Sequence, residues 1–221
     1  MNLLGILLAS AALVAPPAPS QASLKALVPV TSQVALQAAL KARDNAVRSG
    51  AIRRTDLLTV IDYSRPSTEP RLFVIDIAAD RLRFAERVAH GRGSGENETE
   101  RFSNREGSHM TSLGVFRAAE AYVGQHGVSL RLDGLEPGFN DRARARAIVV
   151  HGAGYVNQTI VAAQGRLGRS WGCPAVRREI ARELIETIKQ GSLVVAYYPD
   201  TDWLARSAFL KAPEPPSADP S

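Results

Sequence analysis

Short apolar runs, rather than long helical periods, make up most of the hydrophobic pattern of this chain. Each run has the length of a β-strand, and polar or glycine-containing segments separate them. Ala78-Ala79-Asp80 can connect two of them as a hairpin. The pattern therefore predicts a mainly β domain with strands at residues 57–61, 72–77, 81–90, 115–116, 128–132, 147–151 and 193–198.

Two other stretches have helical periodicity. The first, residues 31–49, is rich in alanine, follows a possible cap at Thr31 or Ser32, and stops before Gly50. The second, residues 177–190, is amphipathic and stops before Gly191. We expect the first helix to pack on the β domain, and the second to bury its apolar stripe beneath it.

Length and composition fit one domain with flanking segments. The 221 residues are 45% hydrophobic, which is enough for a substantial core, and 17 glycines with 13 prolines favour strands and turns. We expect a helical segment at 23–54, packed on a domain at 55–205. The proline-rich residues 206–221 are expected to form a disordered tail.

The beginning of the chain resembles a secretory signal. Residues 3–14 are apolar, but they are far fewer than the roughly 20 needed to span a membrane. Ser20 and Ala22 place small residues at the −3 and −1 positions of a cleavage site, although no basic residue precedes the apolar run. We predict a signal peptide at 1–22 and a periplasmic or otherwise exported protein without a stable membrane span.

The net charge of +5 and the pI of about 9.7 favour an anionic or carboxylate-rich partner. Charge alone does not choose among nucleic acid, acidic lipid and acidic polymer. The chain has no aromatic-and-basic motif for RNA and no recognition-helix pattern for DNA, so we expect no nucleic-acid partner.

Candidate chemistry is concentrated in residues 148–176. His151 follows an apolar strand, and Cys173, the only cysteine, lies on a glycine-flanked turn. A thiol and an imidazole are the parts of a cysteine nucleophile with its base. Free cysteine is also common as a small buried hydrophobe, but Ser170, Gly172 and nearby arginines favour an exposed turn. We therefore predict that Cys173 is a nucleophile.

The residue after the cysteine restricts where an oxyanion could be bound. Pro174 has no N–H group, so the donors should be the N–H of Cys173 and that of Gly172 or Trp171. Glycine at 172 lets the backbone approach the reacting carbonyl closely. These residues need no metal or cofactor, and the histidines at 90, 109, 126 and 151 lack the HxH or HExxH spacing of a zinc site.

Substrate contacts are predicted around this pair. One of Arg166, Arg169 and Arg177 could bind a substrate carboxylate in a bidentate manner. His90 could lie on the rim of the cleft, and Trp171 is either a lid on the nucleophile or a packing residue. The full predicted set of substrate-binding residues is Ser170, Trp171, Arg169, Arg166, Tyr155 and His90.

These residues resemble the L,D-transpeptidases with a YkuD-type catalytic domain. HGAGYVN followed by GRLGRSWGCPAV resembles the family's His-Gly and Ser-x-Gly-Cys signature. RLFVIDI, VAHGRGSG, FSN, SLGVF, LRLDGLEPGFND and IKQGSLVVAYY resemble its YkuD_2 branch, so that the resemblance covers about residues 55–198. It implies a mainly β fold, a β-sandwich of mixed sheets with a cleft, and an exported enzyme without cofactor that acts on peptidoglycan stem peptides.

By the same resemblance, Cys173 is the nucleophile, His151 is the general base, the Gly152 carbonyl orients the imidazole, and Ser170 supports the turn. The implied reaction forms a thioester after the L-centre of diaminopimelate, releases D-alanine and transfers the acyl group to an amine. Carbapenems acylate the cysteine of such enzymes. We expect a monomer.

Two departures from the wider family affect the acceptor side of the reaction. Trp171 stands where most members have histidine, and Pro174-Ala175 replaces an Ile/Val-Arg/Asn pair. Two alternatives therefore stay open. One is an L,D-carboxypeptidase or endopeptidase that hydrolyses the same thioester, and the other is a catalytically weak cell-wall binding module.

Overall fold

The computed structural model describes residues 21–212. The signal peptide predicted for residues 1–22 falls almost wholly outside this part of the chain, as does the predicted tail from residue 213 onwards. Within residues 21–212, no helix combines the length and apolar character needed to cross a bilayer.

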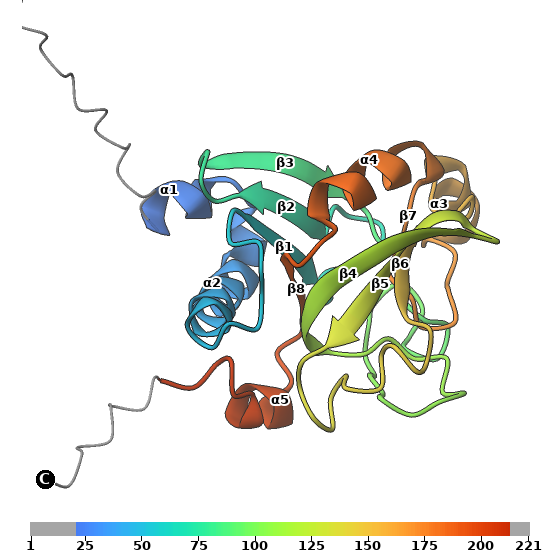
Figure 1. Ribbon diagram of the computed structural model, residues 1–221. Helices are drawn as coiled ribbons and strands as arrows, with labels where there is room; N and C mark the ends of the chain where they lie inside the picture. The colour runs from blue at the N-terminus through green and yellow to red at the C-terminus, as the bar shows by residue number, and fades with distance from the viewer. Residues whose placement is uncertain (1–20, 213–221) are drawn as a thin grey trace, which may run out of the picture.

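Eight strands form one mixed sheet, in the order β3-β2-β1-β8-β4-β5-β6-β7 (Figure 1). The pairs β1–β8 and β6–β7 are parallel, and the other neighbours are antiparallel. The strands are β1 (Leu57–Asp62), β2 (Leu72–Asp76), β3 (Arg81–Glu86), β4 (Gly114–Gly124), β5 (Gly127–Gly134), β6 (Val149–Gly152), β7 (Ala175–Val176) and β8 (Leu193–Tyr197). The β2–β3 hairpin turns at the predicted residues, with Asp80 at φ +49°.

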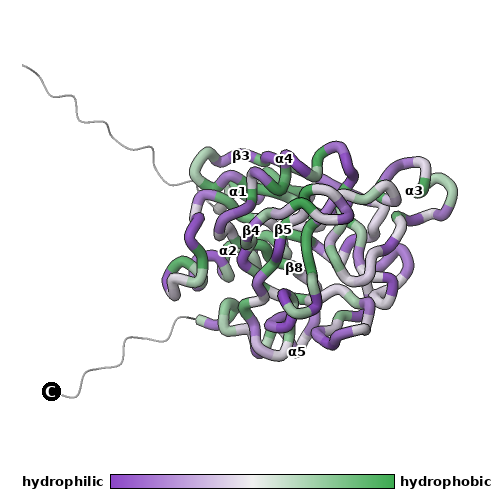
Figure 2. Tube along the Cα trace, turned by 45° about the vertical axis from the view of Figure 1, so that its right-hand side comes forward, coloured by the Kyte–Doolittle hydropathy of each residue, from purple (hydrophilic) through white to green (hydrophobic). Residues whose placement is uncertain are grey.

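The sheet curves until its two ends almost meet. Ala89, just after edge strand β3, makes an antiparallel bridge to Ala175 of the opposite edge strand, with N–O distances of 2.8 and 3.3 Å. One hydrophobic core contains Val74 from one half of the sheet and Leu130 and Val150 from the other. The hydrophobic segments in Figure 2 run along the central strands. The predicted mainly β fold of mixed strands is confirmed, in the form of a nearly closed barrel.

The amphipathic helix predicted after the cysteine is α4 (Arg178–Ile188). Its apolar residues Ile180, Ala181, Leu184, Ile185 and Ile188 belong to the core enclosed by the curved sheet. The helix packs against β5 and β6, the strand that carries His151. Because α4 fills the barrel from this side, it supports the backbone of the strand on which the candidate base lies.

The N-terminal helix covers the other face of β1, β2 and β8. After α1 (Gln21–Ala26) and a 3-10 turn at Val30–Ser32, α2 (Gln33–Arg48) packs its buried alanines and leucines on that face. The helix ends at the predicted place, with Gly50 at φ +69°. Ser32 occupies the N-cap position, but its hydroxyl donates to Asp62 Oδ2 at 2.7 Å instead of capping.

The chain after β8 departs from the prediction. A helix, α5 (Thr201–Arg206), buries Trp203, whose indole donates to Glu136 Oε2 at 2.8 Å. Ser207 also donates to Glu136, and Asn45 donates to the Phe209 carbonyl at 2.7 Å. The prediction of a disordered tail from residue 206 is therefore wrong for residues 206–211, because their polar groups are tied to the domain.

Another short helix was not predicted. Asn157 caps α3 (Gln158–Gln164) by accepting the Ile160 N–H at 2.8 Å, and Gly165 ends it at φ +67°. The helix buries no residue, so it has no apolar stripe for a sequence pattern to reveal.

Candidate active site

The fold places His151 and Cys173 on neighbouring segments of the backbone. His151 lies in β6 and pairs in parallel register with Ala175 of β7, two residues after the cysteine. The His151 N–H also points to the Pro174 carbonyl, at 3.4 Å. A separation of 22 residues in sequence is thus closed by one strand pairing.

Both side chains line one cavity of about 700 Å³. Its walls come from the β4–β5 hairpin, from β6, and from the segment that leads into the cysteine. The residues around it are Tyr122, Gly124, Gln125, His126, Ser129, Arg146, Ala147, Val149, His151, Tyr155, Arg169, Ser170, Trp171 and Cys173. Of the predicted substrate-binding residues, Tyr155, Arg169, Ser170 and Trp171 reach this cavity.

The hydrogen bond at the inner nitrogen of His151 fixes how the ring can act. Its Nδ1 lies 3.1 Å from the Gly152 carbonyl, which can only accept, so Nδ1 carries the proton. Nε2 is then free to accept a proton in the neutral ring. Burial lowers the pKa of His151, the Gly152 carbonyl partly opposes this, and the nearby charge of His126 lowers it further. The imidazole is therefore held neutral near pH 7.

Cys173 is set up as a neutral thiol. Burial raises the pKa of this thiol, while the Val149 N–H and the Arg146 guanidinium pull it back. The sulfur lies 3.6 Å from the Ala147 carbonyl, to which the S–H donates. A neutral thiol and a neutral imidazole that line one cavity favour proton transfer at the moment of attack, rather than a resting thiolate–imidazolium pair.

Ser170 organises the turn that carries the cysteine. Its hydroxyl donates to the Cys173 carbonyl at 2.6 Å and accepts the Gly172 N–H at 3.0 Å. The Gly172 N–H is therefore occupied and is not an oxyanion donor in this geometry. In the described part of the chain, the N–H groups of Cys173 and Trp171 make no hydrogen bond to protein, which leaves these two as candidate donors.

Glycine is required at 172 by both conformation and space. Its φ is +127°, and an added Cβ would lie 2.8 Å from the Met110 carbonyl oxygen. On another side, Gly91 presses against it, since a Cβ on Gly91 would lie 2.8 Å from the Gly172 Cα. The turn that carries the nucleophile, residues 170–173 (the nucleophile turn), is thus held between Gly91 and Met110.

The buried side chain of Arg71 supports the long polar segment 91–112. Arg71 donates to the Val88 carbonyl at 2.8 Å, to Thr99 Oγ1 at 3.1 Å and contacts His90 Nδ1 at 2.7 Å. His90 is only 1% exposed, and burial together with Arg71 lowers its pKa to about 4. The prediction that His90 lies on the cleft rim is therefore wrong: it is part of the support beneath this segment.

The arginines expected to bind substrate carboxylates already have carboxylate partners. Glu96 binds Arg166 at 2.8 Å and Arg169 at 2.6 Å. Arg177 makes a bidentate pair with Glu86, at 2.8 and 2.9 Å, and does not line the cavity. The structure thus does not present any of the three as a free cation at the cleft.

Arg146 is a candidate functional residue that the sequence pattern did not reveal. Its guanidinium donates to the Met110 carbonyl at 2.7 Å and to Ser103 and Ser112 oxygens at 2.5 Å each. It lines the cavity and lowers the pKa of the cysteine thiol. In the sequence it is one of three alternate arginines in RARARA, and nothing in that run separates it from its neighbours.

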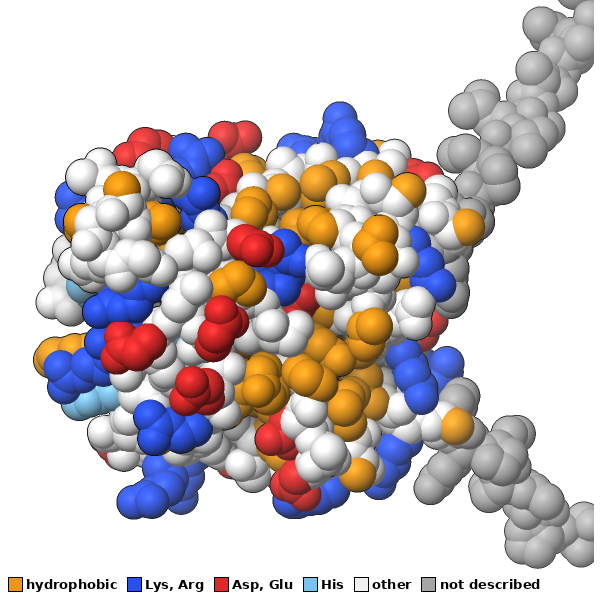
Figure 3. Space-filling model, turned by 180° about the vertical axis from the view of Figure 1, so that it is seen from behind, with side chains coloured by type: hydrophobic (Ala, Val, Ile, Leu, Met, Phe, Trp, Pro, Cys, Tyr) orange, Lys and Arg blue, Asp and Glu red, His pale blue; other side chains and the backbone are white. Residues whose placement is uncertain are grey.

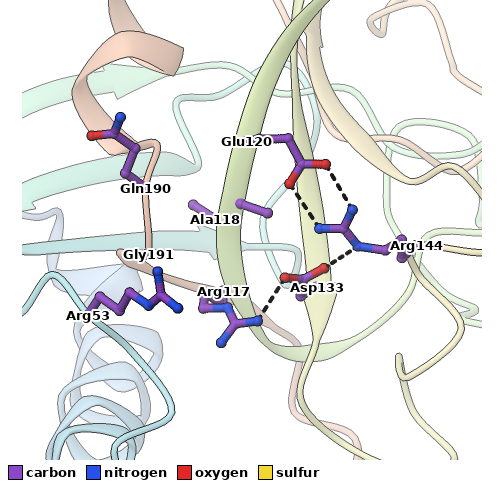
Figure 4. Close-up of a pocket in the computed structure, with 9 residues that line it drawn as sticks. Arg53, Arg117, Ala118, Glu120, Asp133, Arg144, Gln190 and Gly191 are labelled. Atoms are coloured by element: carbon purple, nitrogen blue, oxygen red, sulfur yellow. Dashed lines mark hydrogen bonds and ion pairs between the residues drawn. The ribbon is translucent and has the colours of Figure 1, made fainter.

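A second cavity, of about 360 Å³, lies on the outer side of β4 and β5 (Figure 4). Arg144 bridges Glu120 at 2.8 Å and Asp133 at 2.5 Å, and Asp133 also holds Arg117 at 3.0 Å. These opposite charges largely neutralise one another, and neither the thiol nor an imidazole lines the cavity. On the face seen in Figure 3, acidic and basic side chains are likewise interspersed. The cleft of Cys173 is therefore the better candidate for chemistry.

The fold and site together define a class: a nearly closed, mixed β domain with a cysteine and a histidine in one cleft. The sequence profile of the YkuD_2 family, the L,D-transpeptidase catalytic domain, matches residues 29–197. The chain belongs to this family.

Solved structures that resemble this one are distant. An L,D-transpeptidase from Mycobacterium smegmatis is 14% identical, with 65% of this chain and 59% of that chain covered and a TM-score of 0.39. The helical cell shape determining protein Pgp2 from Campylobacter jejuni is 14% identical, with 76% and 56% covered and a TM-score of 0.41. This chain thus spans somewhat over half the length of these proteins. No curated protein matches the sequence.

Proposed function

We propose that this protein is an exported cysteine acyltransferase that links peptidoglycan stem peptides by L,D-transpeptidation. The observation that carries the proposal is that a cysteine thiol and a neutral histidine line one cavity of about 700 Å³. The family to which the chain belongs supports a peptide substrate.

In the proposed first half-reaction, the Cys173 sulfur attacks the carbonyl carbon after the L-centre of diaminopimelate. Nε2 of His151 takes the thiol proton, and the N–H groups of Cys173 and Trp171 stabilise the oxyanion. The C–N bond then breaks, His151 returns the proton to the leaving nitrogen, and D-alanine departs. A thioester to Cys173 remains.

In the second half-reaction, the amine of another stem peptide attacks the thioester carbonyl carbon. His151 accepts a proton from the attacking nitrogen and returns it to the sulfur as the C–S bond breaks. The products are a cross-linked peptide and the free thiol, so that no metal, redox group or cofactor enters the balance. Water in place of the amine would give hydrolysis.

The test is intact-mass spectrometry of the protein mixed with muropeptide tetrapeptides, with Cys173→Ala beside the wild type. We expect an acyl adduct that requires Cys173, followed by cross-linked dimers. Release of D-alanine with only shortened peptides would replace the transpeptidase by a hydrolase. A wild-type protein that forms no adduct and whose folded thiol resists alkylation would contradict both and favour the binding module.

A further inference from the structure

One exposed arginine beside the cysteine turn, Arg92, has no carboxylate partner among the described residues. Arg166, Arg169 and Arg177 are all held by glutamates, and Arg146 is enclosed by backbone and hydroxyl oxygens. Arg92 is exposed, and among residues 21–212 no acidic side chain pairs with it.

The fold holds Arg92 next to the cysteine turn by other means. Its backbone N–H donates to the Ser170 carbonyl at 2.8 Å, three residues before the nucleophile. Its guanidinium lies over the ring of Trp171, 5.5 Å from the centroid, and Nη2 is 3.0 Å from His109 Nδ1. His109 in turn packs on Trp171, with ring centroids 5.2 Å apart. We call these three residues the Arg92 cluster.

The cluster is built like a binding site rather than like packing. Trp171 is 70% exposed, although it is among the largest apolar side chains, and it lines the cavity of the cysteine. His109 has φ +53°, a conformation that costs energy for a residue with a Cβ. The Nε and Nη2 atoms of Arg92 face His109 Nδ1 at 3.3 and 3.0 Å, whereas Nη1 makes no hydrogen bond within residues 21–212 and can donate to an anion.

We propose that the Arg92 cluster binds a carboxylate of the stem peptide whose carbonyl lies at Cys173, with Trp171 covering the adjoining peptide. This inference rests on the proposed function and assigns a subsite within it. Two carboxylates of a tetrapeptide have the required chemistry: the C-terminal one of D-alanine and the one at the D-centre of diaminopimelate. Arg92 does not line the cavity itself but contacts Trp171, which does, so the proposed carboxylate site lies beside the cavity.

The test measures binding rather than turnover, in the Cys173→Ala protein, by calorimetry with three peptides. They are the tetrapeptide, its C-terminal amide and its diaminopimelate side-chain amide. Adding Arg92→Gln should weaken binding of the free acid about tenfold or more, the usual loss for a hydrogen bond to a charged group. The amide that lacks the recognised carboxylate should bind equally with and without the substitution, which identifies the carboxylate.

Arg105→Gln is the matched control, because Arg105 is exposed on the same segment and lies outside the cluster. It should leave all three affinities unchanged, and Arg92→Lys should recover part of the lost affinity. Equal losses for the acid and both amides, or no loss, would overturn the subsite while leaving the proposed function intact. Absence of any stem-peptide binding to the parent protein would instead count against the proposed function, and the subsite would fall with it.

Discussion

At the residue scale, the site depends on a glycine that no other residue can replace. We expect Gly172→Val to lower acylation of Cys173 by roughly 100-fold or more, because a Cβ at 2.8 Å from the Met110 oxygen must displace the nucleophile turn. Most of the fold should remain, since the clash is local. Acylation by a stem peptide or a carbapenem, followed by mass spectrometry, measures the loss.

Gly165→Val is the matched control for this experiment. Gly165 also has positive φ, +67°, but no atom lies within 4 Å of an added Cβ. Valine at 165 therefore has a positive φ in the left-handed region without a contact, whereas valine at 172 has both the contact and a φ of +127°, outside that region. A Gly172→Val protein that is acylated as fast as the Gly165→Val protein would show that the turn is not clamped as described.

The positive charge of Arg146 should influence the pKa of the Cys173 thiol. Its guanidinium favours the thiolate and so lowers the pKa of Cys173. Removing the charge in Arg146→Met should raise that pKa, so that at a fixed neutral pH less thiolate is present. We expect the pH profile of the iodoacetamide alkylation rate to move to higher pH.

Arg146→Lys separates charge from packing in that experiment. Lysine keeps the positive charge but cannot make all the hydrogen bonds to Met110, Ser103 and Ser112. The lysine variant should keep a profile close to that of the wild type. Identical upward shifts in both variants would mean that hydrogen bonding to the 103–112 segment, not charge, sets thiol reactivity.

At the element scale, the β4–β5 hairpin reaches over the cleft. Its two-residue turn, Gln125-His126, places the His126 ring on that of His151, with centroids 4.5 Å apart and planes 27° apart. When protonated, His126 disfavours a second positive charge on His151 and so lowers its pKa. The hairpin thus contributes to the base as well as to the wall of the cavity.

We expect His126→Phe to move the acid limb of the activity profile to higher pH. Phenylalanine can keep the stacked ring but removes the charge, so the pKa of His151 rises. Because the base must be neutral, activity is lost as pH falls through that pKa, and this loss then begins at higher pH. The pH dependence of Cys173 acylation by a stem peptide measures it, and an unmoved acid limb would contradict a role for His126.

The sequence predicted the elements that have a periodic pattern and missed those that do not. Strands β1, β2 and β8, helix α2 and helix α4 were found because each buries an apolar stripe or run. Helix α3 buries nothing, and β7 has only two residues, so neither leaves a pattern. The prediction for residues 206–211 was wrong for a different reason. Trp203 of α5 and Ser207 both bind Glu136, which lies 67 and 71 residues earlier in the sequence.

The same distinction applies to the site. The roles assigned to Cys173 and His151 came from residue type and a family resemblance, and they stay predictions, although one strand pairing brings the two residues to one cleft. Which arginine is free could not be predicted, because it depends on Glu96 and Glu86 reaching Arg166, Arg169 and Arg177. The composition gives the number of charged residues, but which of them form ion pairs depends on the fold.

At the scale of the whole molecule, the N-terminal helix is expected to unfold together with the barrel. Leu36 of α2 is fully buried in the core that also contains Val60, Phe73 and Val195 of three strands. We expect Leu36→Ala to lower the free energy of unfolding by about 2–5 kcal/mol, through lost burial and the cavity left behind.

Val34→Ala, on the same helix, is the control, because Val34 is 63% exposed and its truncation should change stability by less than about 0.5 kcal/mol. Denaturant unfolding should be followed by far-ultraviolet circular dichroism for the whole fold and by tryptophan fluorescence in a Trp171→Phe background, which leaves Trp203 of the same core as the reporter. One core implies that both signals shift together in Leu36→Ala. If circular dichroism alone shifted, residues 23–54 would unfold separately from the rest of the domain. The boundary expected near residue 55 would then divide two independently unfolding parts.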